Sequence, residues 1–549
     1  MMFQKIVFMK DFKNNIISLV KKIQRVELLL LALLLILSFM VRWRDVNTVP
    51  FGIENDEFSF IATSLFRQNN ISASDKGVYV TANDSNASIY PVSGKIIDLS
   101  FVLFGVDFLS PRKLLVFVDL VSLVFFFFLA RRFLSKKTSL LITFFYSFST
   151  YNLITGRIAL IGFFSGLFVY PAILLLLSVN PKHKQKNLAY SFLSGALILL
   201  SLLTYNLAYA MPLVGILIII GKSFFDKTTV KSTILLIIFL LLPLILYPQW
   251  MVNLKTVKDS KSYALGNAIY DSDQRIINLH KVVSNIYFSK KILFNSLSYN
   301  ASDMAVNFPG PLVNAWISLA FAISLIIGLL NVRKYLLLLV WFFINFFIYH
   351  IAIGTLFARA WFITIGTIYL ISGIAFDKVL ESNSFKKKYV GYLIIIIIST
   401  YVIHKDLYLY YNYAIYNPAF LTSQKELNNL IKEKDYDIGK GLLVVMPEGT
   451  IPATNIETAY TALSFYYLAS NPEKVEYLKK ANKQELGLLT NQEFNEIGKD
   501  YLAAKRTIIT GNSNLSGIEN KIKKINQCLY STKRYGYFTK LNLNCSESQ

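Results

Sequence analysis

The chain has 549 residues, of which 54% are hydrophobic, 15% are aromatic and only 16% are charged, and its mean hydropathy is +0.46. Soluble domains carry about 25% charged residues, so this composition argues against a large soluble enzyme and indicates a membrane protein. The net charge of +23 does not indicate nucleic-acid binding, because the basic residues lie between apolar runs instead of in one patch. Two cysteines and four scattered histidines give neither a disulfide framework nor the spacing of a zinc site.

Apolar runs are the main structural signal along the chain. A bilayer core about 30 Å thick needs ~20 mostly apolar residues for each helix that crosses it. Eleven segments fit, namely 26–42, 113–130, 138–152, 158–178, 188–204, 208–221, 232–250, 313–330, 335–353, 360–376 and 389–405. We therefore predict an α-helical polytopic membrane protein with about 11 transmembrane helices, several of them near the lower limit of length.

The basic residues alternate between loops. The N-terminal segment and every second loop together hold 22 lysines and arginines, whereas the short loops between them hold only Arg157 and Arg359. By the positive-inside rule the N-terminus is cytoplasmic, and eleven spans place the C-terminus outside. The first apolar run lacks a small-residue cleavage site and ends in Arg42-Trp43-Arg44, so we expect an uncleaved anchor in the plasma membrane.

Three long segments then lie on the outer side: 43–112, 251–312 and 406–549. The last drops the apolar-run pattern, which predicts two parts, a transmembrane domain (1–405) and a small extracytoplasmic α/β domain (406–549). Its expected elements are helices at Leu421–Lys434, around Ile456–Ala469 and from Thr490, and strands at Leu442–Met446, Thr507–Thr510 and Tyr535–Leu541. Cys528 and Cys545 would lie where disulfides persist, so a bridge between them is expected, with two reduced thiols as the alternative.

The densest group of carboxylates follows the first apolar run. Glu54, Asp56 and Glu57 fall within four positions, and such like charges repel unless a cation or proton intervenes. This pattern suits a general base, but it also suits a hydrated loop or a helix start, where acidic residues are favoured in the first turn. A divalent cation, Mg²⁺ or Mn²⁺, could also occupy the cluster.

Arg157 and Arg359 are exceptions to the orientation rule. A guanidinium group matches a phosphate at two points, so these side chains could hold a phosphate anion at the outer membrane surface. The alternative is that each arginine reaches a lipid headgroup. His350, inside an apolar run, is interpreted as a satisfied interior histidine.

The order of these features resembles the GT-C membrane glycosyltransferases, in particular the protein O-mannosyltransferases and lipid A aminoarabinose transferases. The resemblance covers about 40–380. The matching pieces are Pro50-Phe51-Gly52 with Asp56-Glu57, Ser88-Ile89-Tyr90-Pro91 with Lys95, Leu109-Ser110-Pro111-Arg112, Tyr151 through Arg157, Leu203-Thr204-Tyr205-Asn206, Asn307-Phe308-Pro309-Gly310-Pro311 and Arg359-Ala360.

The resemblance implies an inverting glycosyltransferase of the cell envelope that takes a sugar from a polyprenyl-phosphate-linked donor. On this comparison Asp56 deprotonates the acceptor hydroxyl, Glu57 supports it, and Arg359 with Arg157 binds the leaving phosphate. Such a base and such cations agree with the chemistry of the transfer. Further candidate site residues are Glu54, Asp84, Tyr90, Lys95, Arg112 and Tyr205. The acceptor would be a lipid, a glycan or a protein, and the other partner is the lipid bilayer.

Two alternatives differ in where their key residues lie. An O-antigen polymerase or ligase would carry its chemistry in the 251–312 segment. A transporter would show charges near the middle of its spans and broken helices in repeated halves, and the sequence reading finds neither.

Overall fold

The computed structural model describes the larger part of the chain. The described residues are 25–44, 46, 55–69, 91–159, 161–179, 184–205, 208–248, 250–251, 270–271, 276–290, 293–294, 311–352, 361–381, 385–413, 442–446, 488–496, 507–511, 515–525, 529–535 and 538–544. The predicted helices Leu421–Lys434 and Ile456–Ala469 lie outside them, as do Cys528 and Cys545.

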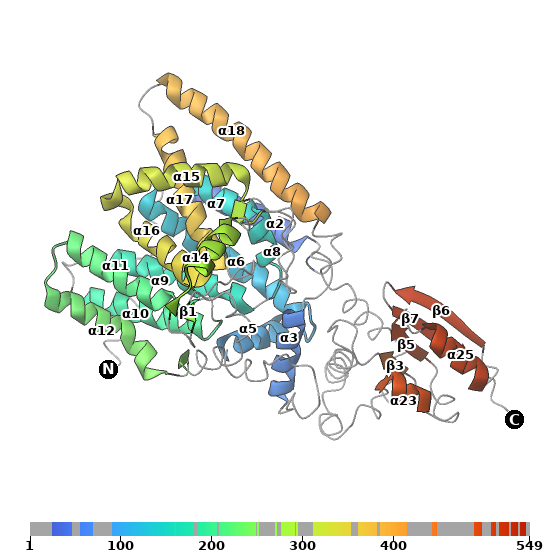
Figure 1. Ribbon diagram of the computed structural model, residues 1–549. Coiled ribbons are helices and arrows are strands. Elements are labelled where there is room, and N and C mark those ends of the chain that lie inside the picture. The colour runs from blue at the N-terminus through green and yellow to red at the C-terminus, as the bar shows by residue number, and fades with distance from the viewer. Residues whose placement is uncertain are drawn as a thin grey trace.

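Most of the described residues form helices (Figure 1). Their bounds are α2 Arg25–Trp43, α3 Asn55–Gln68, α5 Pro91–Phe104, α6 Ser110–Phe133, α7 Lys136–Phe148, α8 Thr150–Thr155, η2 Ile161–Ser165, α9 Gly166–Ser178, α10 Lys184–Leu202, α11 Met211–Phe225, α12 Val230–Leu246, α14 Leu279–Lys290, α15 Ala315–Leu330, α16 Val332–Asn345, η6 Phe346–Ala352, α17 Phe362–Leu380, α18 Phe385–Tyr408 and η8 Leu409–Tyr413. Each of the eleven predicted apolar segments is helical over most of its length.

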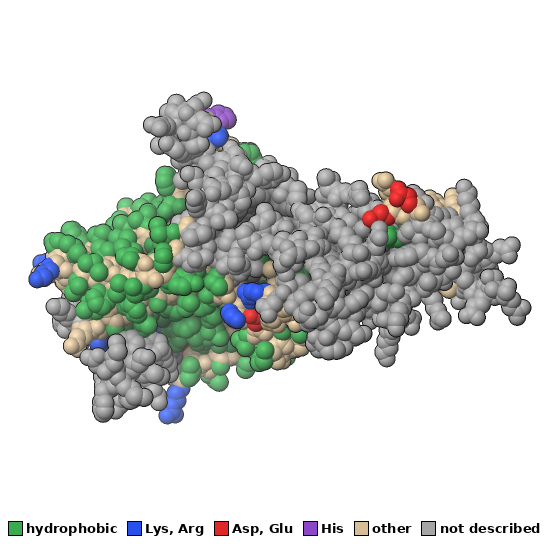
Figure 2. All heavy atoms as spheres, turned by 90° about the horizontal axis from the view of Figure 1, so that it is seen from below, with side chains coloured by type: hydrophobic (Ala, Val, Ile, Leu, Met, Phe, Trp, Pro, Cys, Tyr) green, Lys and Arg blue, Asp and Glu red, His purple; other side chains and the backbone are tan. Residues whose placement is uncertain are grey.

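Four of the described helical segments are long and apolar enough to cross a membrane: Arg25–Trp43, Ser110–Phe133, Phe362–Leu380 and Tyr389–Tyr411. In the most apolar stretch of each segment, 83% of the residues are buried in α17, 28% in α2 and 22% in Tyr389–Tyr411. A helix that is apolar all round and buried belongs to the interior of a bundle. α17 is therefore an inner helix, and α2 and α18 present apolar surface outward. Figure 2 shows hydrophobic side chains over much of the coloured surface of the helices.

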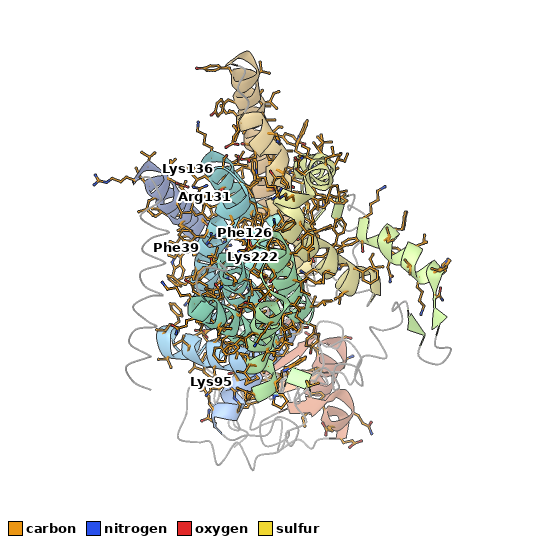
Figure 3. All side chains as sticks on the ribbon, turned by 90° about the vertical axis from the view of Figure 1, so that its left-hand side faces the viewer. Phe39, Lys95, Phe126, Arg131, Lys136 and Lys222 are labelled. Carbon is orange, nitrogen blue, oxygen red and sulfur yellow. The ribbon has the colours of Figure 1, made fainter. Side chains whose placement is uncertain are left out.

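α2 and α6 run antiparallel, because ion pairs join the start of one to the end of the other. Glu27 pairs with Arg131 (Oε1 to Nε, 2.7 Å), and Arg42 pairs with Asp119 (Nε to Oδ2, 2.8 Å). In Figure 3, Arg131 and Lys136 lie at one end of the bundle and Lys95 at the other. The end that carries Arg131 is the cytoplasmic end of the predicted topology, so α3 and α5 lie at the predicted outer end.

Glycines bring the helices close together. A Cβ atom at Gly195 of α10 would overlap the carbonyl oxygen of Leu240 in α12, and one at Gly366 of α17 would lie 2.5 Å from the Tyr170 hydroxyl. Small residues are used in this way where helices pack inside membranes. Neither position accepts a larger side chain without movement of its neighbour.

The helices α3, α5 and α14 lie in segments that the sequence reading treats as outer loops. α3 and α5 pack together through Asp98, which accepts hydrogen bonds from Ser64 (2.5 Å), Arg67 (3.0 Å) and Gln68 (2.7 Å). At its start, α5 docks on the end of α10, where Ser93 Oγ donates to the Thr204 carbonyl at 2.5 Å. The outer helices are thus fixed to each other and to the bundle.

The described strands near the C-terminus form a five-stranded sheet in the order β4-β3-β5-β7-β6 (Figure 1). β3 is parallel to β4 and β5, and β7 is antiparallel to β5 and β6. The bounds are β3 Leu442–Met446, β4 Leu488–Thr490, β5 Thr507–Gly511, β6 Leu529–Tyr535 and β7 Phe538–Asn544, with helices α23 Asn491–Glu496 and α25 Leu515–Ile525. A separate pair, β1 Tyr270–Asp271 and β2 Ile276–Ile277, is antiparallel.

The sheet confirms some of the predicted elements and corrects others. The predicted strand Leu442–Met446 has the bounds of β3, and the strand near Thr507 and the helix from Thr490 are also found. The strand predicted near Tyr535–Leu541 is found with shifted bounds, because β7 runs from Phe538 to Asn544 and Tyr535 is the last residue of the preceding strand, β6. α18 continues to Tyr408, and buried Asp406 accepts a hydrogen bond from Thr150 (3.0 Å).

Candidate active site

Glu57 and Arg112 form the centre of the candidate site. Glu57 lies in the first turn of α3, where an acidic residue favours the positive end of the helix dipole, and Arg112 lies in the first turn of α6. Arg112 donates from Nε to Oε1 (2.7 Å) and from Nη2 to Oε2 (2.6 Å), and both side chains are buried. The backbone N–H of Ala159 donates to the same Oε1 at 2.9 Å. Glu57 therefore joins three separate segments of the chain.

This arrangement gives Glu57 a positioning role. A carboxylate that receives two bonds from a guanidinium and one from a backbone amide is held in one orientation, and it is enclosed by protein. It fixes the first turn of α3, which also contains Asp56. The side chain of Asp56 lies outside the described residues, as does Glu54.

Arg157 lies inside the protein and binds the end of α2. Its Nε donates to the carbonyl oxygen of Arg42 (2.6 Å) and its Nη2 to that of Val41 (2.7 Å) and of Arg44; Nη1 donates to the Tyr410 hydroxyl. Carbonyl groups at a helix end have no partner within the helix, and a guanidinium there satisfies them and suits the negative end of the dipole. Arg157 is buried, so its side chain does not reach out to lipid headgroups.

The ion pair between Arg42 and Asp119 lies next to the turn that precedes Arg157. Arg42 donates to Ser38 Oγ (2.5 Å) and to the Ser147 carbonyl (2.9 Å) in addition to its contact with Asp119. A Cβ atom at Gly156 would lie 3.0 Å from Arg42 Nε and 3.1 Å from Asp119 Oδ2, so the chain next to Arg157 packs directly on this pair. The ion pair thereby supports the turn that carries both Arg157 and Ala159.

Arg42, Asp119 and Tyr410 were not among the candidate residues from sequence. Asp119 could have been found, because it is a carboxylate well inside an otherwise apolar run, and ionisable residues at such positions are candidates for function. Asp119 lies within α6, and its partner Arg42 lies in the last turn of α2. The pair is buried between helices, where it holds them together.

The other candidates are placed as follows. Lys95 is 81% exposed on α5 and lies 3.6 Å from Asp98 Oδ2, so the structure does not bring it to the Glu57–Arg112 pair. Tyr205 follows the end of α10 and is half-buried. Asp84, Tyr90 and Arg359 lie outside the described residues. His350, as interpreted, is an interior histidine: it stacks on Trp361 with ring centroids 3.3 Å apart, and its Nε2 is 3.2 Å from Thr364 Oγ1.

The acidic cluster that contains Glu54, Asp56 and Glu57 is also a possible site for a divalent cation. Among the residues that the structure describes, no group of three or more His, Cys, Asp or Glu side chains could hold one. Of the cluster, only the Glu57 side chain belongs to that set, and its carboxylate oxygens are bonded to Arg112 and Ala159.

The helical bundle with α3, α5 and α14 shares its fold with solved structures of other proteins. The crystal structure of ArnT from Cupriavidus metallidurans bound to undecaprenyl phosphate aligns with 94% of this chain and 98% of its own, at 9% sequence identity and a TM-score of 0.51. The apo oligosaccharyltransferase from Archaeoglobus fulgidus aligns with 95% of this chain and 74% of its own, at 12% identity and a TM-score of 0.51. No protein-family model and no curated protein matches the chain. The predicted resemblance to GT-C enzymes is confirmed for the fold.

Proposed function

We propose that this protein is an inverting glycosyltransferase that moves a sugar from a polyprenyl-phosphate-linked donor to an acceptor hydroxyl at the outer face of the membrane. The observation that carries the proposal is the buried Glu57–Arg112 pair, which fixes the first turn of α3 at the predicted outer end of a GT-C fold. One of the similar structures, that of ArnT, contains undecaprenyl phosphate, which supports a lipid-phosphate donor here.

In the proposed reaction Asp56 is the general base. It takes the proton of the acceptor hydroxyl while the oxygen attacks the anomeric carbon, and the bond from that carbon to the donor phosphate breaks. A base contributes only when it is held within hydrogen-bond reach of the proton that it removes. Glu57, Arg112 and the Asp98 contacts at the other end of α3 supply the rigid support that such placement needs.

The leaving phosphate needs fixed positive charge, and we assign Arg359 to this role. Arg157 was expected to share it, but its guanidinium donates to three carbonyl groups and to Tyr410. We therefore propose that Arg157 positions the outer site by closing the end of α2. In this proposal the N-terminus is cytoplasmic, and the C-terminal sheet is part of an extracytoplasmic domain that helps to choose the acceptor.

The test is transfer by the purified protein, reconstituted in lipid, with a panel of radiolabelled polyprenyl phosphate sugars. With the sugar that the wild type transfers, Asp56→Asn should lower turnover by roughly 100-fold or more, because the acceptor loses its base. Asp226→Asn makes the same chemical change at an exposed residue beyond the end of α11 and should leave turnover unchanged. Near wild-type turnover in Asp56→Asn would show that the assigned role is wrong.

A further inference from the structure

α14, Leu279–Lys290, has its apolar and polar sides reversed relative to a helix of a water-soluble protein. The four apolar side chains Leu279, Val283, Ile286 and Tyr287 are 74%, 67%, 48% and 60% exposed. Their spacing of four, seven and eight positions from the first places them on one face of the helix. The buried residues of α14 are polar, namely Asn285 and Ser289, one turn apart. Figure 3 shows this helix, in yellow-green, at the edge of the bundle.

The polar side attaches α14 to the protein. Asn285 Nδ2 donates to the carbonyl oxygen of Ile351 at 2.9 Å. Ile351 belongs to η6, a π-helix that continues α16. The widened turns of a π-helix alter the usual pairing of backbone carbonyls, and here one carbonyl is bonded to a side chain of α14. The polar side of α14 therefore contacts the protein, and its apolar side faces away from the protein.

The position of η6 sets the level of α14 relative to the bilayer. α16 begins beside Arg333 and Lys334, in one of the basic loops that the positive-inside rule assigns to the cytoplasm. α16 and η6 comprise 14 and 7 residues, and a helical segment of that total length spans roughly 30 Å, about the thickness of the hydrocarbon core. Its far end, where α14 is attached, lies near the outer boundary between acyl chains and headgroups.

The charges of α14 fit the same place. His280 and Lys290 are exposed, Lys281 is half-buried, and the helix contains no acidic residue. A helix with an apolar face, basic residues and no acidic residue is typical of helices that lie in the plane of a membrane, because the apolar face enters the acyl boundary and the cations meet the phosphates.

We propose that α14 is an interfacial helix that lies in the outer leaflet, with the face formed by Leu279, Val283, Ile286 and Tyr287 in contact with acyl chains. The helix binds the lipid surface on one side and η6 on the other. It thereby attaches the outer loop 251–312 to the bilayer. The partner is the phospholipid leaflet itself, and the inference does not depend on the proposed transfer reaction.

The experiment uses the full chain, with Cys528 and Cys545 replaced by serine, in nanodiscs of phosphatidylcholine and phosphatidylglycerol. A nitroxide spin label is attached to single cysteines made by Val283→Cys or Ile286→Cys, with Ser284→Cys and Lys95→Cys as controls. We expect the ratio of collision with oxygen to collision with a water-soluble nickel complex to be about threefold or more higher at Val283 and Ile286 than at Lys95, because oxygen concentrates in acyl chains. Ser284, beside them on the more polar side, should give a lower ratio.

Two outcomes would overturn the proposal. Equal nickel accessibility at Val283 and Lys95 would mean that the face lies in water. Low accessibility to both reagents together with an immobilised label would mean that protein, such as a second copy of the chain, covers it. Circular dichroism of each labelled variant checks that it is folded.

Discussion

The guanidinium of Arg112 donates two hydrogen bonds to the carboxylate of Glu57, from Nε to Oε1 at 2.7 Å and from Nη2 to Oε2 at 2.6 Å, and both side chains are buried. One comes from the start of α6 and the other from the start of α3, so the pair joins a predicted transmembrane helix to an outer helix. Removal of one partner leaves the other charge buried without its counter-ion, which costs about 3–5 kcal/mol.

Arg112→Ala should therefore lower the melting temperature of the purified protein strongly, and Arg112→Lys should do so less, because lysine keeps the charge but not the two-point contact. Lys95→Ala is the control, since Lys95 is highly exposed and its loss should change little. Thermal unfolding in detergent measures all three. An Arg112→Ala variant as stable as the Lys95→Ala control would contradict the structural role of the pair.

The Arg42–Asp119 pair offers a test by replacement. Asp119→Ala should destabilise the protein because Arg42 stays buried among Ser38 and Ser147 without its carboxylate. The double variant Arg42→Met/Asp119→Leu should recover much of the lost melting temperature, because apolar residues of similar volume can replace a buried ion pair at little cost. If the double variant is as unstable as the single one, Arg42 is needed for its serine contacts and not for its charge pair.

Substitutions of Arg359 and of Arg157 should have different effects, the first on donor affinity and the second on stability. Arg359→Lys should weaken the affinity for a polyprenyl phosphate sugar and Arg359→Ala should nearly abolish it, since lysine lacks the planar fork. Arg157→Lys should instead lower the melting temperature, because it loses bonds to the carbonyls at the end of α2. Unchanged donor affinity in both Arg359 variants would leave contact with lipid headgroups as the explanation of that residue.

The predicted topology can be checked by labelling. In a background without Cys528 and Cys545, a membrane-impermeant thiol reagent added from outside should react with cysteines at Ser85, Ser272 and Ser513 and not with one at Lys184. The reason is that the first three lie in the predicted outer segments and Lys184 in a basic loop. Reaction at Lys184 in intact cells would rule out this orientation.

Helices were predictable from sequence where the residues of the helix itself, without its neighbours in the fold, indicate that it forms. Apolar runs fix the existence of helices such as α6 and α17, because run length and hydropathy need no knowledge of the partner. α3, α5 and α14 are short and mixed in composition, and their polar contacts, such as Asn285 with Ile351, decide their placement. The shifted bounds of the strand near Tyr535–Leu541 have a similar origin, since strand-forming residues continue on both sides of the break between β6 and β7.

The site was predictable in its residues but not in its pairings. The acidic group and Arg112 were both recognised as candidates, yet nothing in their spacing indicates that Glu57 would pair with Arg112. Asp119 was overlooked because one carboxylate barely lowers the mean hydropathy of a run that still averages 2.4. Arg157 was read as a ligand-binding residue because its exceptional position on the outer side is visible in sequence, whereas its backbone acceptors in α2 are not.

The closure of α2 by Arg157 has a consequence for biogenesis. The carbonyl groups of Val41 and Arg42 receive their bonds from a side chain 116 and 115 residues later in the chain. During synthesis the first helix leaves the ribosome long before Arg157 does, so the carbonyl groups at its C-terminal end must stay hydrated or be shielded by the insertion machinery until the residues around α8 are made. A nascent chain that stops before residue 157 would therefore hold an inserted but unfinished first helix, and assembly of the outer site would begin only after the turn at Gly156 has been made.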